Sequence, residues 1–131
     1  MSKEQYVSFK VAQLLKDKGF DWDCYGSYNL VEQALDECSV TVISHTNKNS
    51  TLGEFWISAP TQQMACDWVE KTYGFFIEVS RHIDINGNYH YFYMILDKEC
   101  KYASSGTHDN NYPSKYEAIE SALEYVLTNI I

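Results

Sequence analysis

Three side chains that can carry or move a proton, Glu78, His82 and Tyr91, fall within the aromatic stretch from Phe75 to Asp97. The strand pairing expected for this stretch places His82 directly opposite Tyr91, with Glu78 further along the same face. General acid–base catalysis needs such groups within hydrogen-bond reach of a substrate in a cleft. An open sheet face is not a cleft, so we favour a structural or binding role for the three residues.

The remaining candidates for chemistry are weaker. His45 and the pair His108-Asp109 lie in loop-like segments, where an isolated His–Asp pair is most simply part of a solvated loop. The chain contains no nucleophile elbow, no G-x-G-x-x-G motif and no phosphate-binding loop. We therefore assign no catalytic residue and no cofactor, and the sequence favours a non-enzymatic protein over an enzyme.

The four cysteines lack the spacing of a metal or redox site. No two of them form a C-x-x-C pair, which argues against zinc binding and thiol exchange. The chain opens MSKEQ without a signal peptide and has no apolar run of transmembrane length. We therefore expect a cytoplasmic protein with reduced thiols and no membrane partner. Cys24 and Cys66 lie on apolar faces and are predicted to be buried, and the other two cysteines are Cys38 and Cys100.

The charge balance argues against a nucleic-acid partner. The chain has 18 acidic residues against 10 basic ones, a formal net charge of -8, and Arg81 is its one arginine. Phosphate recognition favours clustered lysine and arginine, whereas the basic residues here are scattered. Acidity of this degree is more often a matter of solubility than of function.

The stretch from Phe75 to Asp97 is predicted to form a β-hairpin. Asn86-Gly87 is the strongest two-residue signal for a type I′ turn, which needs positive φ at both central positions. With this pair at the tip, Val79 lies opposite Met94, and a shift by one residue would exchange the two faces. The face expected to pack in the core, against Trp68 and Leu123, carries Phe75, Ile77, Val79, Phe92, Met94 and Leu96.

The opposite face of this hairpin is the candidate binding surface for a protein partner or for a second copy of the chain. Tyrosine is enriched at protein interfaces because it combines a large apolar body with a polar tip. Two alternatives stay open: the tyrosines cover a solvated sheet face, or residues 20–57 pack over them. The candidate residues are Tyr89, Tyr91, Tyr93, Phe76, Glu78 and His82.

Capping signals predict the first helix and the segment after it. Ser8 is expected to cap a helix that ends at Gly19, with Phe20 packing against Leu15 in a Schellman motif. From Phe20 to Tyr25 apolar and polar residues alternate, which predicts a half-buried strand.

The middle of the chain gives mixed signals. Asn29 to Glu37 begins like a short capped helix, whereas Val40 to Ile43 is β-branched and predicts a strand. Phe55 to Ile57 fits either a short strand or a lead-in to the next helix. That helix is expected to start near Pro60, with Ser58 as its cap.

Two helices flank the hairpin in the second half. One ends at Gly74, and the other begins at the capping box of Ser114 and Glu117. A third strand is expected at Cys100 to Ala103, which gives the order α-β-β-β-α. Double-stranded-RNA-binding domains share this order, but they carry a lysine cluster at the start of the last helix, where this chain has Lys115 alone.

The chain is therefore predicted to be a single α+β domain over residues 1–131. We expect an antiparallel sheet of roughly three to five strands with about three helices packed mainly on one face. The first half is expected to add a helix and further strands to the same sheet.

Three runs carry a family resemblance: VSFKVAQLLKDKGFDWDCY, SAPTQQMACDWVEKTYGFFIEV and YPSKYEAIESALEYVL. In them the chain resembles a group of small uncharacterised proteins encoded in phages, prophages and mobile elements of gut Bacteroides-type bacteria. The resemblance covers most of the chain, and in the last run it falls on Tyr112, Ser114, Glu117 and Ala118. It implies a mobile-element origin and a single domain, and it implies no activity and no functional residue.

The sequence leaves three hypotheses for function. The leading one is a non-catalytic accessory or protein-interaction module of a phage or mobile element, because the sequence has a tyrosine-rich face and no recognisable site chemistry. The first alternative is an acidic protein that mimics nucleic acid or inhibits a host enzyme. The second is a small enzyme with an unrecognised site, which a concave polar pocket would support.

Overall fold

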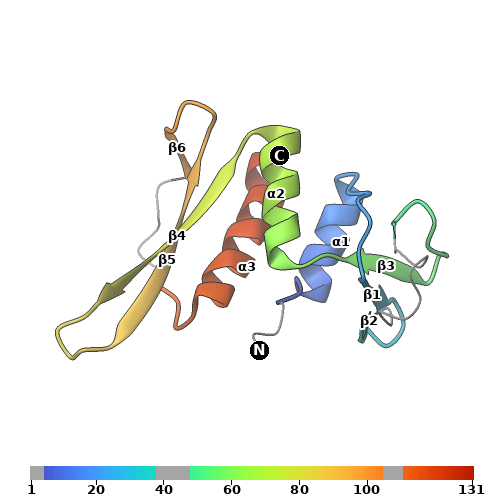
Figure 1. The fold of residues 1–131 in the computed structure, drawn as a ribbon, viewed down its shortest axis with the longest axis horizontal. Coiled ribbons are helices and arrows are strands. Elements are labelled where there is room, and N and C mark those ends of the chain that lie inside the picture. The colour runs from blue at the N-terminus through green and yellow to red at the C-terminus, as the bar shows by residue number, and fades with distance from the viewer. Residues whose placement is uncertain (1–4, 38–47, 105–110) are drawn as a thin grey trace. The chain divides into compact units, whose positions relative to one another are not determined.

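The structure is a computed structural model that describes residues 5–37, 48–104 and 111–131 (Figure 1). The chain divides into two compact units, Met1–Ala65 and Cys66–Ile131. Their helices and antiparallel sheets confirm the predicted α+β class, while the single domain over residues 1–131 stays a prediction. The predictions that fall outside the described residues concern Val40 to Ile43, Cys38, His45, His108 and Asp109.

The first unit combines a helix with a small antiparallel sheet. Its strands follow the order β2-β1-β3. A further helix, α2, begins in this unit and continues into the second. The elements are α1 (Phe9–Asp17), β1 (Gly26–Asn29), β2 (Leu35–Glu37), β3 (Trp56–Ala59) and α2 (Gln62–Tyr73).

The second unit has the predicted α-β-β-β-α order and a sheet of its own, with strand order β4-β5-β6. The expectation that strands of the first half extend this sheet is wrong, because each unit forms a separate three-stranded sheet. The elements after α2 are β4 (Phe76–Ile83), β5 (Tyr89–Leu96), β6 (Tyr102–Ser104), α3 (Lys115–Tyr125) and a final π-helical turn (Val126–Ile130).

Both predicted ends of α1 are confirmed. The Ser8 hydroxyl accepts a hydrogen bond from the Val11 N–H at 3.2 Å. At the other end Gly19 has a φ of 93°, and the Phe20 N–H donates to the Leu15 carbonyl at 2.9 Å, as a Schellman motif requires. Phe20 and Leu15 are both buried, so this cap also contributes to the core of the first unit.

The segment after α1 differs from prediction in two ways. Residues 20–25 keep the predicted alternation of burial, but the strand starts only at Gly26. Asn29 begins a turn instead of a helix: its side-chain oxygen accepts hydrogen bonds from two following N–H groups, and Gln33, with a φ of 55°, then leads the chain into β2. An asparagine that caps a turn binds the same backbone groups as one that caps a helix, so the sequence pattern fits both.

The α2 helix starts after Pro60, but its cap is Thr61 and not the predicted Ser58. The Thr61 hydroxyl accepts the Met64 N–H at 3.2 Å, while Ser58 is buried inside β3. The β3 strand also settles the two alternatives for its region in favour of a strand. Gly74 ends α2 with a φ of 81°, as predicted.

In the second unit β5 is the central strand. β4 pairs along one edge, and β6 and an isolated bridge between Tyr91 and Tyr112 lie along the other. The predicted capping box of α3 is confirmed, since the Ser114 hydroxyl accepts the Glu117 N–H at 3.2 Å. In Figure 1, α3 and residues 66–73 of α2 lie on the same side of this sheet.

The pairing of β4 with β5 differs from the prediction by one residue. Val79 lies opposite Tyr93 and not opposite Met94, whose partner is Glu78. Leu96 likewise pairs with Phe76. Because side chains alternate between faces, this one-residue shift exchanges the two sets of β5 side chains relative to those of β4.

The turn causes the shift. The Asn86-Gly87 signal predicts a positive φ at both residues. In the structure Gly87 has a positive φ, 83°, and Asn86 does not. The Asp84 N–H donates to the Asn88 carbonyl at 2.9 Å, and the Asp84 carboxylate accepts the N–H groups of Asn86 and Asn88, both at 2.9 Å. This is a three-residue loop, a type I turn followed by a left-handed bulge residue, in place of the expected two-residue loop.

The β5–β6 turn repeats this geometry around Asp97. Its carboxylate accepts the N–H groups of Glu99 at 2.9 Å and Lys101 at 3.0 Å, and the Asp97 N–H donates to the Lys101 carbonyl at 2.8 Å. Cys100 takes the left-handed position with a φ of 61°. The third strand therefore begins at Tyr102, just inside the region where it is predicted.

Candidate functional site

The observed register defines two faces of the β4–β5–β6 sheet, which we name the covered face and the open face. The covered face packs against α3, and the open face lies on the other side. The covered face carries Ile77, Val79, Arg81, Ile83, Tyr89, Tyr91, Tyr93 and Ile95. The open face carries Phe76, Glu78, Ser80, His82, His90, Phe92, Met94, Leu96 and Tyr102.

Burial identifies the covered face. Ile95 is fully buried and Tyr93 is 8% exposed. Burial raises the pKa of the Tyr93 hydroxyl, and the neighbouring hydroxyls of Tyr112 and Tyr125, the latter on α3, add to the rise. The predicted core of the hairpin is therefore wrong for three of its residues, which the shifted register moves to the open face: Phe92, Met94 and Leu96.

The six residues predicted to form one partner-binding face are divided between the two faces. Tyr93 belongs to the core, Tyr91 is half-buried, and Tyr89 is exposed beneath the Arg81 guanidinium, which lies 4.2 Å from its ring centroid. These tyrosines share the covered face. The predicted residues that lie on the open face are Phe76, Glu78 and His82.

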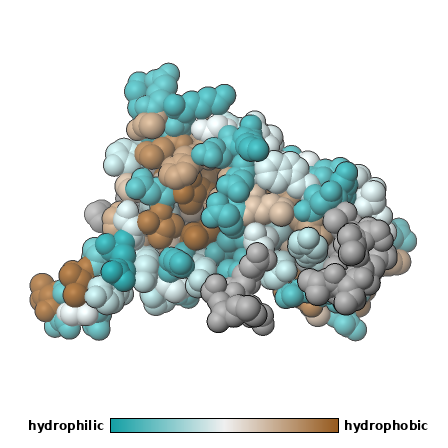
Figure 2. Space-filling view, in the orientation of Figure 1, coloured by the Kyte–Doolittle hydropathy of each residue, from teal (hydrophilic) through white to brown (hydrophobic). Residues whose placement is uncertain are grey.

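Large apolar side chains form most of the open face. Phe76 pairs with Leu96, and Leu96 with Tyr102, so the three form a row across the sheet. Phe76 is 47% exposed and Tyr102 is 67% exposed, while Phe92 and Met94 are half-buried. Figure 2 shows the apolar side chains on the other side of the hairpin, where they gather between β4 and the helices. Neither α3 nor residues 66–73 of α2 pack on the open face, so the row forms an uncovered hydrophobic surface within the described part of the second unit.

Imidazole rings occupy the end of the open face near the β4–β5 turn. His82 pairs with His90 and their rings stack at 5.5 Å, with the Phe92 ring 5.7 Å from that of His82. His90 Nε2 lies 2.8 Å from Asp84 Oδ2. Hydrogen bonds from the Asn88 backbone and from His90 hold the pKa of the Asp84 carboxyl below its usual value. This end is the polar margin of the apolar surface.

The proton-transfer trio expected from the sequence is not assembled. Tyr91 lies opposite Arg81 on the covered face. Glu78 and His82 lie on the open face, where the partner of His82 is His90. Since side chains on opposite faces of a sheet cannot act on one substrate atom, these three residues do not form a proton-transfer site together.

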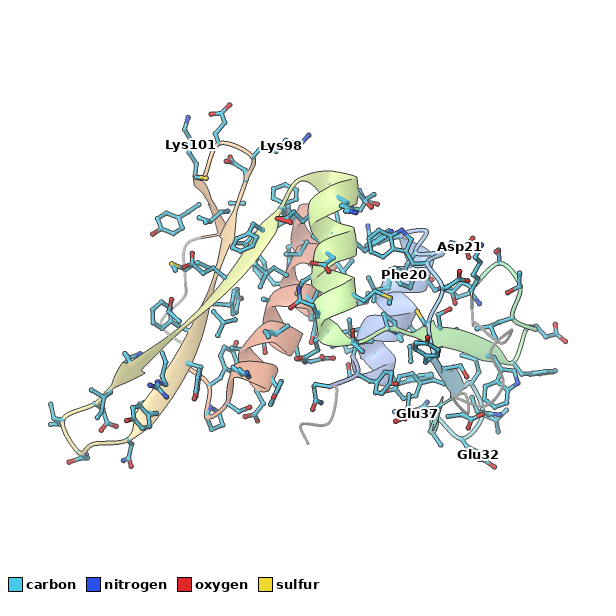
Figure 3. The ribbon with its side chains drawn as sticks, in the orientation of Figure 1. Phe20, Asp21, Glu32, Glu37, Lys98 and Lys101 are labelled. Atoms are coloured by element: carbon cyan, nitrogen blue, oxygen red, sulfur yellow. The ribbon has the colours of Figure 1, made fainter. Side chains whose placement is uncertain are left out.

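Lysines mark the other end of the open face. Lys98 and Lys101 project from the β5–β6 turn (Figure 3), and Lys101 Nζ lies 3.1 Å from Glu99 Oε2. This ion pair is highly exposed, so it contributes little to stability. The open face thus runs from a lysine-bearing turn to an Asp–His pair.

The first unit contains a small hollow of about 110 Å³ between β3, the start of α2 and the segment before β1. Within it the Cys24 thiol donates to the Trp22 carbonyl at 3.4 Å and lies 3.8 Å from the Met64 sulfur. Burial raises the pKa of Cys24 to about 12. The thiol is therefore protonated at neutral pH, which makes it a poor nucleophile.

The burial predicted for the cysteines is confirmed for Cys24, whereas Cys66 is half-buried. Burial, together with the nearby Asp67 carboxylate, raises the pKa of Cys66 to about 12. Cys24, Cys66 and Cys100 are free thiols. In the described ranges no group of His, Cys, Asp and Glu side chains is arranged to hold a metal ion. Nor does any helix there combine the length and apolarity needed to cross a membrane.

Sequence reasoning missed the apolar part of the open face, formed by Phe92, Met94 and Leu96. A signal for it exists, because both hairpin turns begin with an aspartate, Asp84 and Asp97, and such a residue favours a side-chain-stabilised type I turn over a type I′ turn. Comparison with known proteins adds no further residue: no protein-family model matches the chain, and neither does any curated protein or solved structure.

Proposed function

We propose that this protein is a non-catalytic protein-interaction module and that the open face binds a protein partner. The observation that carries the proposal is the apolar row of Phe76, Leu96 and Tyr102 on the side of the sheet away from α3, in which Phe76 and Tyr102 are exposed and Leu96 is half-buried. A solvated face of an antiparallel sheet is normally polar. Contiguous exposed apolar surface is typical of sites that bind another protein.

The composition of the open face defines the kind of partner. Aromatic and methionine side chains are enriched at the centres of interfaces, where they exclude water, and a polar rim surrounds them. Phe76 and Met94 provide such a centre, and Glu78 and His82 form part of the rim. Because the chain carries a net charge of -8, we expect a partner whose contact surface is apolar in the middle and basic at its edge.

Two features favour binding over catalysis. The candidate acid–base groups Glu78 and Tyr91 lie on different faces of the sheet. The Cys24 thiol in the hollow of the first unit is protonated at neutral pH. From the family resemblance we infer that the chain is an accessory protein of a phage or mobile element and that it acts in the cytoplasm of the bacterial host.

A matched pair of substitutions tests the proposal. Phe76→Ser removes an exposed ring from the open face, and Phe55→Ser removes a ring of 58% exposure from the first unit. The wild type is used to capture a partner from host cells, and binding of the purified partner to all three proteins is then measured by calorimetry. Truncation of an anchoring aromatic at an interface costs about 2 kcal/mol, or roughly thirtyfold in Kd. We expect that loss for Phe76→Ser and no change for Phe55→Ser.

Three results would contradict the proposal. One is equal binding by the wild type and a folded Phe76→Ser variant. Another is equal loss in both variants. The third is the absence of any host protein that forms a stoichiometric complex with the wild type after purification.

A further inference from the structure

β4 forms an open edge of its sheet. It runs for eight residues and pairs with β5 alone among the described strands. Tyr91, the β5 residue opposite Arg81, exchanges hydrogen bonds with Tyr112 on its other side, at 2.8 and 2.7 Å. Hydrogen-bonded and non-hydrogen-bonded pairs alternate along an antiparallel ladder, so Arg81 and every second residue of β4 direct their backbone groups away from β5. These outward-facing residues are Ile77, Val79, Arg81 and Ile83.

This edge has little of the usual protection against strand addition. Soluble proteins protect long edges with charged side chains, especially lysine, or with proline, a bulge or a very short strand. β4 carries the charged residues Glu78 and Arg81, but it contains no proline and no lysine, and its pairing with β5 is regular along its whole length. Within the described ranges no backbone group bonds to the outward N–H and carbonyl groups of β4, and Ile83 at its end is 59% exposed. The edge is therefore suited to accept another strand.

We propose that a second copy of this chain occupies the edge, so that β4 pairs antiparallel with β4 of a partner subunit about a two-fold axis. In a two-fold pairing, residues equally far from a central residue lie opposite each other. With Ser80 at the centre, every outward-facing residue meets an outward-facing partner. Ile77 then lies opposite the partner's Ile83, and Val79 opposite the partner's Arg81.

The same alignment also pairs hydrogen-bonding side chains. It places Glu78 opposite the partner's His82, and symmetry repeats the pair. Centring the pairing on Arg81 would bring two arginines together and would place Glu78 opposite the partner's Asp84. Centring it on Val79 would leave Ile83 without a β4 residue opposite it. Backbone pairing and side-chain charge thus select the same alignment.

The dimer goes beyond the proposed function because backbone groups at the β4 edge hold it together, whereas partner binding uses the apolar side chains of the open face. Glu78 and His82 serve both proposals, and Phe76 serves partner binding alone. Joining the two sheets edge to edge would continue the open face from one subunit into the other.

Cross-linking tests the alignment directly. Ser80 lies opposite the partner's Ser80 in a non-hydrogen-bonded pair, whose Cα atoms are about 4.5 Å apart, within reach of a disulfide. Ser80→Cys, combined with Cys38→Ser and Cys100→Ser to remove two other thiols, should give a disulfide-linked dimer under mild oxidation. Glu78→Cys in the same background is the control, because its two copies would be more than about 13 Å apart. A mixture of the Glu78→Cys and His82→Cys proteins should give a mixed disulfide.

Sedimentation equilibrium of the unaltered chain gives a second readout. We expect a dimer whose dissociation constant rises roughly tenfold in His82→Glu, since glutamate would then oppose Glu78 twice. The exchanged variant with Glu78→His and His82→Glu should restore the affinity. A monomer at all concentrations, or equal cross-linking of Ser80→Cys and Glu78→Cys, would overturn the inference. The proposed function would survive that result if Phe76→Ser still lost partner binding.

Discussion

The two faces of the β4–β5–β6 sheet both carry large apolar side chains, yet α3 covers only one of the two faces. On the covered face Tyr93 and Ile95 are buried, while their neighbours Met94 and Leu96 on the open face are half-exposed. Apolar residues follow one another from Tyr91 to Leu96 without the alternation typical of a sheet with one solvated face. The hydrophobic pattern of β5 therefore locates the strand but does not choose the buried face. That choice depends on the turn.

Among changes to the two hairpin turns, the largest effect is expected from a substitution that strains the first turn. Gly87→Val places a β-branched residue at a φ of 83°, which costs about 1–2 kcal/mol or more of unfolding free energy. Nothing lies within 4 Å of the added Cβ, so the strain is in the backbone and not in packing. Chemical denaturation measures the loss. Gly53→Val has similar space without the positive φ, and an equal loss there would contradict the turn geometry.

A smaller effect of opposite sign is expected at the second turn. Cys100 occupies the same left-handed position as Gly87, with a φ of 61°. Cys100→Gly should relieve the strain and, after the entropy that glycine adds to the unfolded chain, stabilise the protein by about 0.5–1 kcal/mol. Cys100→Ala removes the thiol but keeps the Cβ. If both variants stabilise the protein equally in denaturant, the thiol and not the φ angle is the cause.

The smallest expected effect is the acid dependence of the first turn. The pKa of Asp84 is lower in the folded chain than its usual value, so its contribution is fully present above the ordinary carboxyl pKa of about 4 and is lost as the pH falls through the lowered value. The thermal midpoint of the wild type should therefore fall further between pH 6 and pH 3 than that of Asp84→Asn. Parallel curves for the two proteins would show that the turn does not depend on this carboxylate.

Much of the fold could be predicted because its signals are local. The Ser8 cap, the Gly19 Schellman motif and the Ser114–Glu117 capping box each involve residues a few positions apart, and all three are present. No tertiary contact can easily override such signals, since each satisfies backbone groups that a helix end leaves unpaired.

Two of the failed predictions have a common cause. The sequence at Asn29 is compatible with a helix or a turn, and the Asn29 side chain caps a turn. The sequence at Asn86-Gly87 is compatible with a two-residue or a three-residue loop, and the hydrogen bonds of the Asp84 carboxylate stabilise the three-residue loop. In both places the hydrogen bonds of one polar side chain determine which of two local backbone conformations forms.

The error in the hairpin register also affected the predicted candidate site. Aromatic residues were correctly placed on the hairpin, but a one-residue shift put Tyr93 in the core and moved Met94 and Leu96 to the surface. The separate sheet of the first unit could not be predicted either, because the pairing of distant strands depends on tertiary contacts that no local pattern records.

The most direct test of whether one face is open is to introduce a charged residue on each face of β5, in two separate variants, and to compare their thermal unfolding. Tyr93→Asp would place a carboxylate on the covered face against α3, and Met94→Asp would place one on the open face. An unpaired buried charge costs several kcal/mol, so we predict that Tyr93→Asp abolishes or severely weakens cooperative thermal unfolding. Met94→Asp should still unfold cooperatively, with its midpoint lowered only by the like-charge pair that it forms with Glu78 on the opposite strand. Equal destabilisation by both substitutions would contradict an open face and, with it, the binding surface proposed for this protein.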